Sequence, residues 1–225
     1  DVLKSALVGD DESIHDIDSI VRWFNGMKMR FELNVKPVPL KSLSDWKYDG
    51  STVKHVKGKY FSVIGVNVSA SAREVTSWEQ PLIESAKGGV IVFFVQKIKG
   101  VLHFLVQARV EPGNFDAIEM APSLQFTPHN YSPDRPESYP TFYEHFLNAH
   151  PKQIRYDALH SEEGGRFYHD QNRYMIIELN EGALANIPDN YFWLTMRQAK
   201  EIIRFNNYFN IEARSLFACL GLARS

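Results

Sequence analysis

The sequence predicts an α+β domain, in which a mixed or antiparallel β-sheet is flanked by helices. Two observations lead to this fold class. Two apolar runs joined across Lys99-Gly100, within "GGVIVFFVQKIKGVLHFLVQARVE" (88–111), predict a long β-hairpin. Thr195 followed three residues later by Gln198 forms a capping-box pattern, which predicts that a helix begins near the C-terminus.

The elements before the hairpin follow from spacing and from prolines. Ser13 is the expected N-cap of a helix over residues 13–27, whose apolar residues recur at helical spacing: Ile14, Ile17, Ile20/Val21 and Phe24. "VKPVPL" (35–40) predicts an extended connector, so residues 1–40 are interpreted as an N-terminal helix and connector. From Thr52 to Ala70, "VKHV" and "YFSVIGVNV" predict strands separated by the turn "KGK".

The elements after the hairpin complete a single module over residues 1–225. "PSLQFT" (122–127) and "RYMIIEL" (173–179) predict strands, and "YPTFYEHFLNA" (139–149) predicts a helix. Asn210 is the expected cap of "IEARSLFACLGL". With the helix that follows Thr195, this segment predicts a C-terminal helical pair over residues 195–225.

Composition excludes several classes of protein. The net charge of −2 provides no basic field that would attract nucleic acid or an acidic membrane. The single cysteine, Cys219, excludes a disulfide within the chain, and its apolar surroundings predict a small buried residue. Apolar runs fall short of 18 residues and no signal-peptide pattern is present, so a cytoplasmic protein is expected.

"EPGN" (111–114) predicts a turn that positions candidate functional side chains. Proline at its second position and glycine at its third are typical of a type II turn. Such a turn would hold Glu111 and Asn114 rigidly at the end of a strand that carries Gln107 and Arg109 on one face. The turn rules alone explain the same residues as a plain exit from the hairpin.

"SEEGGRF" (161–167) places two carboxylates before paired glycines and an arginine. Gly-Gly permits a close approach of the backbone to a ligand, and Arg166 suits bidentate binding of phosphate. An exposed acidic loop is the alternative interpretation.

Metal and cofactor motifs are absent from the sequence. "REV" (73–75) matches only part of the Nudix hydrolase signature, and Pro81 forbids the helix that would carry the remaining glutamates. His145 and His150 are five residues apart on the expected helix, about 140° around it, so they do not converge on a metal. "GxGxxG", "GxxxxGK[ST]" and "GxSxG" do not occur, although composition alone leaves a Ser-His-Asp triad open. The residues indicate a pocket with arginines, amides, carboxylates and a tryptophan.

Four separated motifs resemble the nucleotide-diphosphate-hexose 2,3-dehydratases. They are "REVTSWEQPLI", "GVLHFLVQARVEPGNFDAIEMAPSLQFTPHNY", "SEEGGRFYHDQNRY" and "WLTMRQAKEIIRFNNYFNIEARSLFACL", and the similarity runs from about Trp23 to the C-terminus. The resemblance implies a Nudix-like fold without Nudix hydrolase activity. It implies a substrate that is a nucleotide-linked 4-keto-6-deoxyhexose, usually the thymidine diphosphate sugar. It also implies two copies of this module in a typical member, so we expect two of these chains to pair as a homodimer.

The chemistry implied by the resemblance is a β-elimination. The C4 ketone acidifies the C3 hydrogen, the C2 hydroxyl leaves, and the enol tautomerises to a 3,4-diketo-2,6-dideoxy sugar. The enzyme needs a base near C3, a donor toward the C4 oxygen and an acid for the departing hydroxyl. The chemistry demands no cofactor and no metal. The product is unstable unless a 3-ketoreductase consumes it, so functional coupling to such an enzyme is expected.

Residue roles follow from the resemblance as hypotheses. Glu111 is the first choice for base or acid and Glu162 the second, with His129 and Tyr131 as further proton-transfer candidates. Arg73 and Arg166, with Arg173 in reserve, are expected to bind the diphosphate, and Trp78 and Gln80 the nucleobase. The other expected substrate contacts are Gln107, Arg109, Asn114, Gln125, Glu163 and Asn172.

Two alternatives stay open at this point. The chain departs from the family pattern, with "PSLQ" and "HNY" where "PTVQ" and "SNY" are usual, and His129 stands where a small hydroxyl residue is expected. A non-catalytic sugar-nucleotide-binding module is the first alternative. An isomerase or epimerase acting on the same keto-sugar is the second. Trp78 also fits a core position, and Arg73–Glu74 a structural ion pair.

Overall fold

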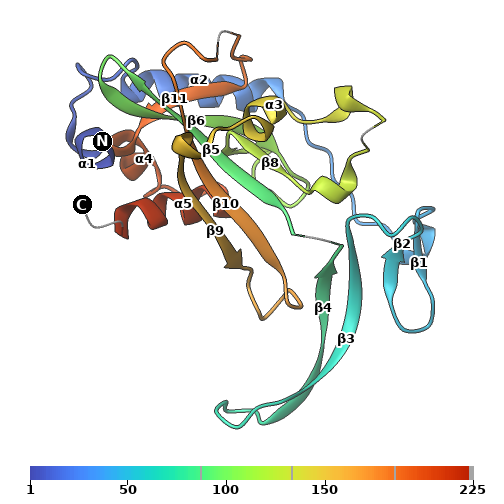
Figure 1. Ribbon diagram of the computed structural model, residues 1–225. Helices are drawn as coiled ribbons and strands as arrows, with labels where there is room; N and C mark the ends of the chain where they lie inside the picture. Colours follow the sequence, from blue (N-terminus) through green and yellow to red (C-terminus); the bar gives the residue numbers. More distant parts are fainter. Residues whose placement is uncertain (87, 133, 185, 223–225) are drawn as a thin grey trace.

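Two β-sheets of unequal size organise the computed structural model, which describes residues 1–86, 88–132, 134–184 and 186–222. A seven-stranded mixed sheet packs against helices, and a four-stranded antiparallel sheet extends away from it (Figure 1). The α+β class expected from the sequence is confirmed. Residues 223–225 of the predicted C-terminal helical pair lie outside the described residues.

The predicted hairpin forms the centre of the larger sheet. β5 (Val90–Ile98) and β6 (Val101–Val110) turn at Lys99 and Gly100, which both have positive φ. The strand order is β11 (Tyr191–Thr195), β6, β5, β10 (Gln171–Leu179), β9 (Ile154–Ser161), and only the β5–β10 pair along it is parallel. Residues 90–95 are buried on both faces of the sheet, which explains why they form an unbroken apolar run.

The two hairpin strands separate beyond their turn, and two short strands fill the gap. β7 (Ile118–Pro122) pairs with β6 and β8 (Leu124–Phe126) pairs with β5. The fully buried Ser123 between them accepts a hydrogen bond from the Phe94 amide at 2.9 Å and donates one to the Leu105 carbonyl at 2.5 Å. The start of β5 and the end of β6 are therefore held apart, which leaves room for a site.

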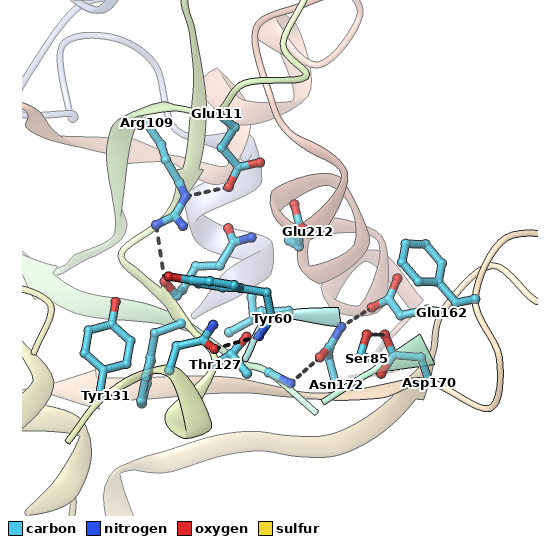
Figure 2. A pocket seen from close by; sticks show the side chains of 16 residues that line it. Tyr60, Ser85, Arg109, Glu111, Thr127, Tyr131, Glu162, Asp170, Asn172 and Glu212 are labelled. Carbon is cyan, nitrogen blue, oxygen red and sulfur yellow. Dashed lines mark hydrogen bonds and ion pairs between the residues drawn. The ribbon is translucent and has the colours of Figure 1, made fainter. Parts of the chain in front are cut away.

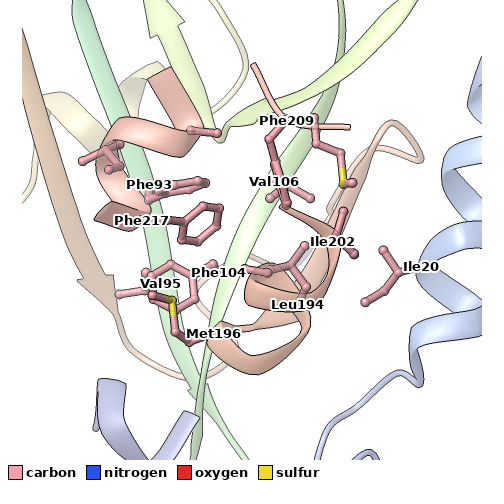
Figure 3. Close-up of a cluster of buried hydrophobic side chains, with 14 of the residues drawn as sticks. Ile20, Phe93, Val95, Phe104, Val106, Leu194, Met196, Ile202, Phe209 and Phe217 are labelled. Atoms are coloured by element: carbon pink, nitrogen blue, oxygen red, sulfur yellow. The ribbon is translucent and has the colours of Figure 1, made fainter. Parts of the chain in front are cut away.

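Both faces of the larger sheet carry a hydrophobic core. On one face, side chains of β5 and β6 pack against α2 (Ile17–Arg30), α4 (Met196–Ile202) and α5 (Ile211–Leu222) (Figure 3). Phe93, Phe104 and Phe217 lie at its centre, with ring centroids 4.8–5.8 Å apart. On the other face, residues such as Phe94 and Leu105 pack against α3 (Tyr143–Leu147) and its surroundings.

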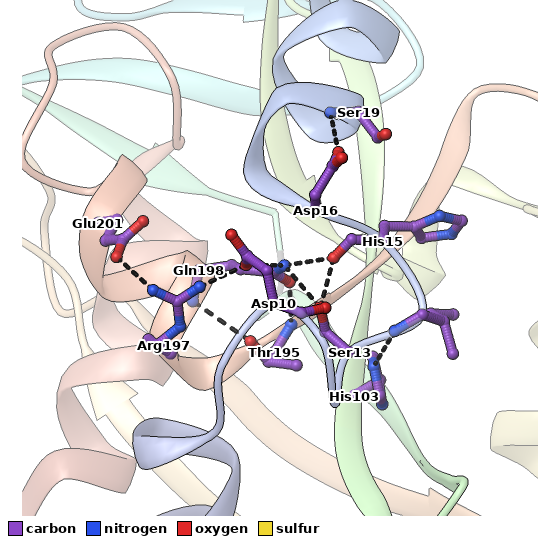
Figure 4. Close-up of polar contacts among 11 residues, drawn as sticks. Asp10, Ser13, His15, Asp16, Ser19, His103, Thr195, Arg197, Gln198 and Glu201 are labelled. Atoms are coloured by element: carbon purple, nitrogen blue, oxygen red, sulfur yellow. Dashed lines mark hydrogen bonds and ion pairs between the residues drawn. The ribbon is translucent and has the colours of Figure 1, made fainter.

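The capping box at Thr195 is confirmed, and it also binds the N-terminal segment. The Gln198 amide donates to Thr195 Oγ1 at 3.3 Å, and the Thr195 amide donates to Gln198 Oε1 at 2.9 Å. Gln198 Nε2 in turn donates to the His15 carbonyl at 2.6 Å and to Ser13 Oγ at 3.2 Å (Figure 4). Ser5 of α1 (Val2–Leu7) accepts a further bond from the Met196 amide.

Several expected boundaries are wrong. The first long helix begins at Ile17 rather than at Ser13, because Asp16 accepts the capping bond from the Ser19 amide at 2.7 Å. The predicted helix over 139–149 shortens to α3, since Pro140 and the left-handed Phe142 precede it. Cys219 is partly exposed and lies 3.6 Å from the Tyr156 hydroxyl, so it is not simply a buried apolar residue.

Other local expectations are confirmed. Residues 35–39 are extended up to a 3₁₀ turn at Leu40–Ser42. The expected cap of the last helix also forms, because the Ala213 amide donates to Asn210 Oδ1 at 2.9 Å. Strands β1, β4, β7, β9 and β11 had not been expected. Further 3₁₀ turns lie at Pro128–Asn130, Pro136–Ser138 and Pro151–Gln153.

The smaller sheet, residues 46–85, is referred to below as the arm. It consists of β1 (Trp46–Tyr48), β2 (Val53–His55), β3 (Phe61–Ser69) and β4 (Ser77–Ser85), paired in that order. Leu82 is the only buried hydrophobic residue in this range, all of which the structure describes. The arm joins the β9–β10 loop through two backbone hydrogen bonds of 2.8 Å, from Ile83 to Arg166 and from Tyr168 to Ile83.

Candidate active site

A cavity of about 580 Å³ opens where the arm meets the start of β5 and the end of β6. Its walls come from segments far apart in the sequence: the ends of the arm, β5, β6, β8, the β9–β10 loop and α5 (Figure 2). The polar and charged residues that line it are Tyr60, Ser85, Arg109, Glu111, Gln125, Thr127, Asn130, Tyr131, Glu162, Asp170, Asn172 and Glu212. The separation of the hairpin strands thus creates a polar pocket at the edge of an apolar core.

The end of β6 fixes an ion pair in this cavity. Arg109 Nε lies 2.7 Å from Glu111 Oε1, and Arg109 Nη1 donates to the Gln125 carbonyl at 3.2 Å. The expected turn forms, since the Asn114 amide donates to the Glu111 carbonyl at 3.1 Å. The type II assignment is wrong, because a type II turn requires positive φ at Gly113 and Gly113 does not have it. The side chain of Glu111 is still held in place by its contact with the Arg109 guanidinium.

A second carboxylate is held by hydrogen-bond donors from β10. Glu162 Oε1 accepts bonds from Asn172 Nδ2 at 2.5 Å and from the Tyr174 hydroxyl at 3.3 Å. Burial, reinforced by the charge of Glu162, raises the pKa of the Tyr174 phenol, so Tyr174 acts as a donor. The Gly89 amide in turn donates to Asn172 Oδ1, and a Cβ atom at Gly89 would lie 2.8 Å from that oxygen. A side chain at Gly89 would therefore displace Asn172 from this position.

Glu212 differs from the other two glutamates of the cavity. It lies in the first turn of α5, whose position is fixed by Asn210: the Asn210 amide donates to the Met120 carbonyl and its Nδ2 donates to Gln125 Oε1, both at 3.0 Å. Burial, followed by the charges of Glu111 and Glu162, raises the pKa of the Glu212 carboxyl. The cavity therefore contains two carboxyl groups with side-chain donors and one whose pKa is raised by burial.

Six residues expected from the sequence meet in this cavity: Arg109, Glu111, Gln125, Tyr131, Glu162 and Asn172. Others do not line it. His129 is exposed, although Thr127, Asn130 and Tyr131 around it face the cavity. Gln107 lies farther along β6 beside Ala121 and Tyr191, and the Asn114 side chain turns back to the Arg109 carbonyl at 3.5 Å.

The expected nucleotide-binding residues form a separate group on and beside the arm. The Arg73 guanidinium lies 5.6 Å from the centre of the Trp78 ring, beside a hollow of about 260 Å³. Trp78 Nε1 donates to Gln80 Oε1 at 2.7 Å, and Gln80 Nε2 donates to the Gly165 carbonyl at 3.0 Å. Trp78 is thus partly exposed rather than part of a core, and Arg73 contacts the indole.

The remaining charged candidates are engaged in surface ion pairs. Arg166 Nε lies 3.3 Å from Glu163 Oε2 within the "SEEGGRF" loop, and both side chains are largely exposed. Arg173 makes two bonds to Asp157, of 2.8 Å and 2.6 Å, across β9 and β10. Both glycines of the loop have open space where a Cβ atom would lie, so nothing in the described chain crowds them.

Sequence reasoning missed Tyr60, Ser85, Asp170 and Glu212. Ser85 Oγ donates to Asp170 Oδ2 at 2.6 Å, which joins the end of the arm to the β9–β10 loop. The Tyr60 amide donates to Asn130 Oδ1 at 3.2 Å, and Tyr60 has a positive φ. These residues come together only through tertiary contacts, so no local spacing identifies them.

Neither a metal centre nor a membrane-spanning helix is found in the described part of the chain. Among those residues, no three histidine, cysteine, aspartate or glutamate side chains are placed to hold a metal ion together. Within the same ranges, every helix is too short or too polar to cross a bilayer.

Solved structures with a similar fold are Nudix hydrolases and related hydrolases. An ADP compounds hydrolase is 11% identical and has a TM-score of 0.40, over 81% of this chain and 94% of its own. A Nudix hydrolase from M. smegmatis is 11% identical with a TM-score of 0.36, over 70% of this chain and 97% of its own. The expected fold was Nudix-like. At these TM-scores the likeness is partial, and it says nothing about activity.

Sequence comparison identifies the family. A family model described as NDP-hexose 2,3-dehydratase matches residues 17–220. A dTDP-4-dehydro-6-deoxy-α-D-glucopyranose 2,3-dehydratase from Streptomyces violaceoruber is 39% identical over 93% of this chain and 47% of its own length. One from Saccharopolyspora spinosa is 43% identical over 97% of this chain and 45% of its own. The chain spans about half the length of these relatives. It belongs to the NDP-hexose 2,3-dehydratase family.

Proposed function

We propose that this chain removes the C2 hydroxyl of a nucleotide-linked 4-keto-6-deoxyhexose as water, most simply dTDP-4-keto-6-deoxy-D-glucose. The product is a 3,4-diketo-2,6-dideoxy sugar nucleotide for deoxysugar biosynthesis. One observation supports this above the others: a single cavity gathers two donor-held carboxylates, an arginine and amide side chains from distant segments. Relatives about twice as long carry the corresponding name.

The proposed reaction needs a base, and the cavity offers two. Glu111 is our first assignment, because its ion pair with Arg109 and the turn at 111–114 hold it in place. Glu162 is the second candidate, anchored by Asn172 and Tyr174. The residue that acts as base takes the proton from C3, which the C4 ketone has made acidic.

Polar groups around these carboxylates fit the sugar. Gln125 and Asn172 are proposed to contact the sugar hydroxyls or the keto oxygen, and Arg109 to stabilise charge that develops on that oxygen. The Tyr131 hydroxyl belongs to the same wall and is a further candidate for proton transfer. His129 stays a candidate only if the exposed 3₁₀ turn at Pro128–Asn130 rearranges when substrate binds.

The nucleotide-binding groups support a site that needs a second module. Arg73 and Trp78 belong to the arm, do not line the cavity, and expose an indole face and a guanidinium. We propose that they bind the base and diphosphate of a substrate held by a second copy of the module, with Arg166 and Glu163 nearby. The nearly coreless arm supports pairing, because a second copy would cover it.

A homodimer of modules over residues 1–225 is therefore proposed, and sedimentation tests it. The expected result is a species of about twice the mass of the monomer. Deleting the arm residues 70–76, which join β3 to β4, should shift the population toward monomer. A monomer that turns substrate over at full rate would contradict the paired arrangement.

The activity is tested by incubation with the 4-keto-6-deoxyhexose linked to thymidine, guanosine or cytidine diphosphate. A 3-ketoreductase and reduced nicotinamide are included, because we propose that such an enzyme consumes the unstable product. A 2,6-dideoxy sugar nucleotide is expected with at least one base. The absence of product with all three bases would overturn the dehydratase assignment.

A non-catalytic nucleotide-sugar-binding module is the second candidate. It is favoured by the separation of Arg73 and Trp78 from the carboxylate cavity, which permits binding without turnover. Binding of nucleotide with no product, and product only after another protein is added, would support it. Deuterium uptake at C3 without loss of oxygen would instead indicate an isomerase.

We also propose a cytoplasmic location, consistent with a single partly exposed thiol. Fractionation of the producing cells tests it.

A further inference from the structure

The three glutamates of the cavity are not equivalent. Glu111 is paired with Arg109 at 2.7 Å, and Glu162 accepts two hydrogen bonds. Within the described residues, no side chain donates a hydrogen bond to the carboxyl group of Glu212, and none forms an ion pair with it. Glu212 projects from α5 into the region between the other two (Figure 2). Two of these carboxyls thus have side-chain partners, and the third has none among the described residues.

The position of Glu212 is set by contacts that fix the first turn of α5 against the sheet. Asn210 caps α5 and ties its first turn to β7 and β8, with bonds of 2.9–3.0 Å to Ala213, Met120 and Gln125. Gln125 also accepts a bond at its carbonyl from Arg109, the partner of Glu111. The backbone that carries Glu212 is therefore connected to the backbone that carries Glu111.

The electrostatic surroundings agree with this placement. Burial raises the pKa of Glu212 most, and the negative charges of Glu111 and Glu162 raise it further, while a hydrogen bond from its own backbone amide and the charge of Arg109 act in the opposite direction. Within one active site, the base and the acid are usually two titratable groups whose surroundings make their pKa values different. A carboxyl group in its protonated form can donate a proton, and a carboxylate can accept one.

We propose that Glu212 is the proton donor to the departing C2 hydroxyl. The inference rests on the proposed dehydration and assigns its missing acid. As the base takes the C3 proton, the electron pair of the C3–H bond forms the C2=C3 double bond and the C2–O bond breaks. The leaving oxygen takes the Glu212 proton and departs as water, so Glu212 becomes a carboxylate. The C3 proton on the base then passes to C2 while the enol proton returns to Glu212, which restores both groups.

A leaving-group comparison tests this role. Hydroxide is a poor leaving group without a proton, but fluoride departs as an anion. Glu212→Gln should lower the rate of water loss by about 10²–10⁴-fold, the usual contribution of a positioned acid. The same variant should release fluoride from the 2-deoxy-2-fluoro substrate within about threefold of the parent.

Glu119→Gln is the matched control. Glu119 is another glutamate whose pKa is raised by burial, but it lies on β7 beside a different cavity. Its replacement should leave both rates unchanged. Thermal unfolding and binding of thymidine diphosphate check that each variant folds. If Glu212→Gln does not fold, Glu212→Asp, which retains a shortened acid, should show the same selective loss of water release in milder form.

Each outcome decides the assignment. Unchanged water loss in a folded Glu212→Gln variant overturns it. So does equal loss of fluoride release and water release, which would place Glu212 at C3 or in substrate binding. Failure of the parent protein to release water while it binds the sugar nucleotide overturns the proposed function, and the assignment with it.

Discussion

The seven-stranded sheet and the arm are built from strands of similar length but opposite burial. β5 is buried on both faces from residue 90 to residue 96, whereas Leu82 is the only buried hydrophobic residue of the arm. A sheet that packs on two hydrophobic cores is stable by itself, but a sheet with one exposed face and few core residues is marginal. The larger sheet therefore supplies rigidity to the carboxylates, and the arm supplies surface for contact.

The cavity lies at the boundary of these two regions. Tyr60 and Ser85 come from the ends of the arm, and Glu111 and Glu162 from the larger sheet. Variants in each region should therefore have different consequences: those in the sheet should affect chemistry and stability, and those in the arm should affect binding.

The largest effect is expected at Glu111. Glu111→Gln should lower turnover by about 10²–10⁴-fold, because the amide cannot accept the C3 proton, while nucleotide binding persists. Glu79→Gln, an exposed glutamate on β4 of the arm, is the control and should retain full turnover. Single-turnover rates with the keto-sugar measure both. An undiminished rate in Glu111→Gln would remove this residue from the mechanism and leave Glu162 as the base.

Truncating a buried side chain of the larger sheet should lower the free energy of unfolding more than truncating a side chain of the arm. Phe104→Ala, fully buried between Phe93 and Phe217, should lower the free energy of unfolding by about 3–5 kcal/mol. Phe61→Ala on the arm, 38% exposed, should cost about 1 kcal/mol or less in a dilute monomer. Urea unfolding at low and high protein concentration measures both. A larger cost of Phe61→Ala at high concentration would support pairing through the arm.

Nucleotide affinity should depend on the arm. Trp78→Ala should weaken thymidine diphosphate binding by about 1–3 kcal/mol if the base stacks on the indole. Trp46→Ala is the control, because Trp46 packs on Phe61 at 4.7 Å and does not line the hollow beside Arg73. Calorimetry distinguishes them. Equal affinity of the Trp78 variant and the parent for thymidine diphosphate would indicate that Trp78 has a structural role.

The smallest effect is expected at the edge of the larger sheet. Hydrogen bonds from Arg173 lower the pKa of Asp157 below 3.8, so the pair contributes stability above that pH and loses it as the pH falls below. Both side chains are more than a third exposed, so Asp157→Asn should cost only about 0.2–1 kcal/mol at neutral pH. The difference should shrink below pH 3.8. Urea unfolding as a function of pH measures it, and a constant difference would contradict an ionic origin.

Local rules identified some elements from the sequence and missed others for physical reasons. The β5–β6 hairpin was predictable because both strands are continuously apolar and Lys99-Gly100 adopts the left-handed turn. The caps at Thr195 and Asn210 were predictable because they involve side chains only three residues from their partners. β9 was missed because its residues alternate between half-buried and exposed and include several polar ones.

The candidate site was predictable where its residues follow a turn or a strand end. Glu111 and Glu162 belong to segments that stand out locally, and both line the cavity. Glu212 does not stand out, because an acidic residue in the first turn of a helix is explained by the helix dipole alone. Only the approach of α5 to β8, through Asn210 and Gln125, makes it part of the site. The type II turn failed because glycine permits positive φ without requiring it.

Pro81 has a consequence for assembly. Ile83 directs its backbone away from β3, toward Arg166 and Tyr168, and strand alternation turns the backbone of Pro81 the same way. The outer edge of β4 therefore lacks an amide donor at Pro81, next to Ile83, whose backbone already pairs with the β9–β10 loop. A regular fifth strand added there would lack one hydrogen bond, which disfavours pairing of another chain along this edge. Any neighbour must meet this region through side chains, where recognition can be selective.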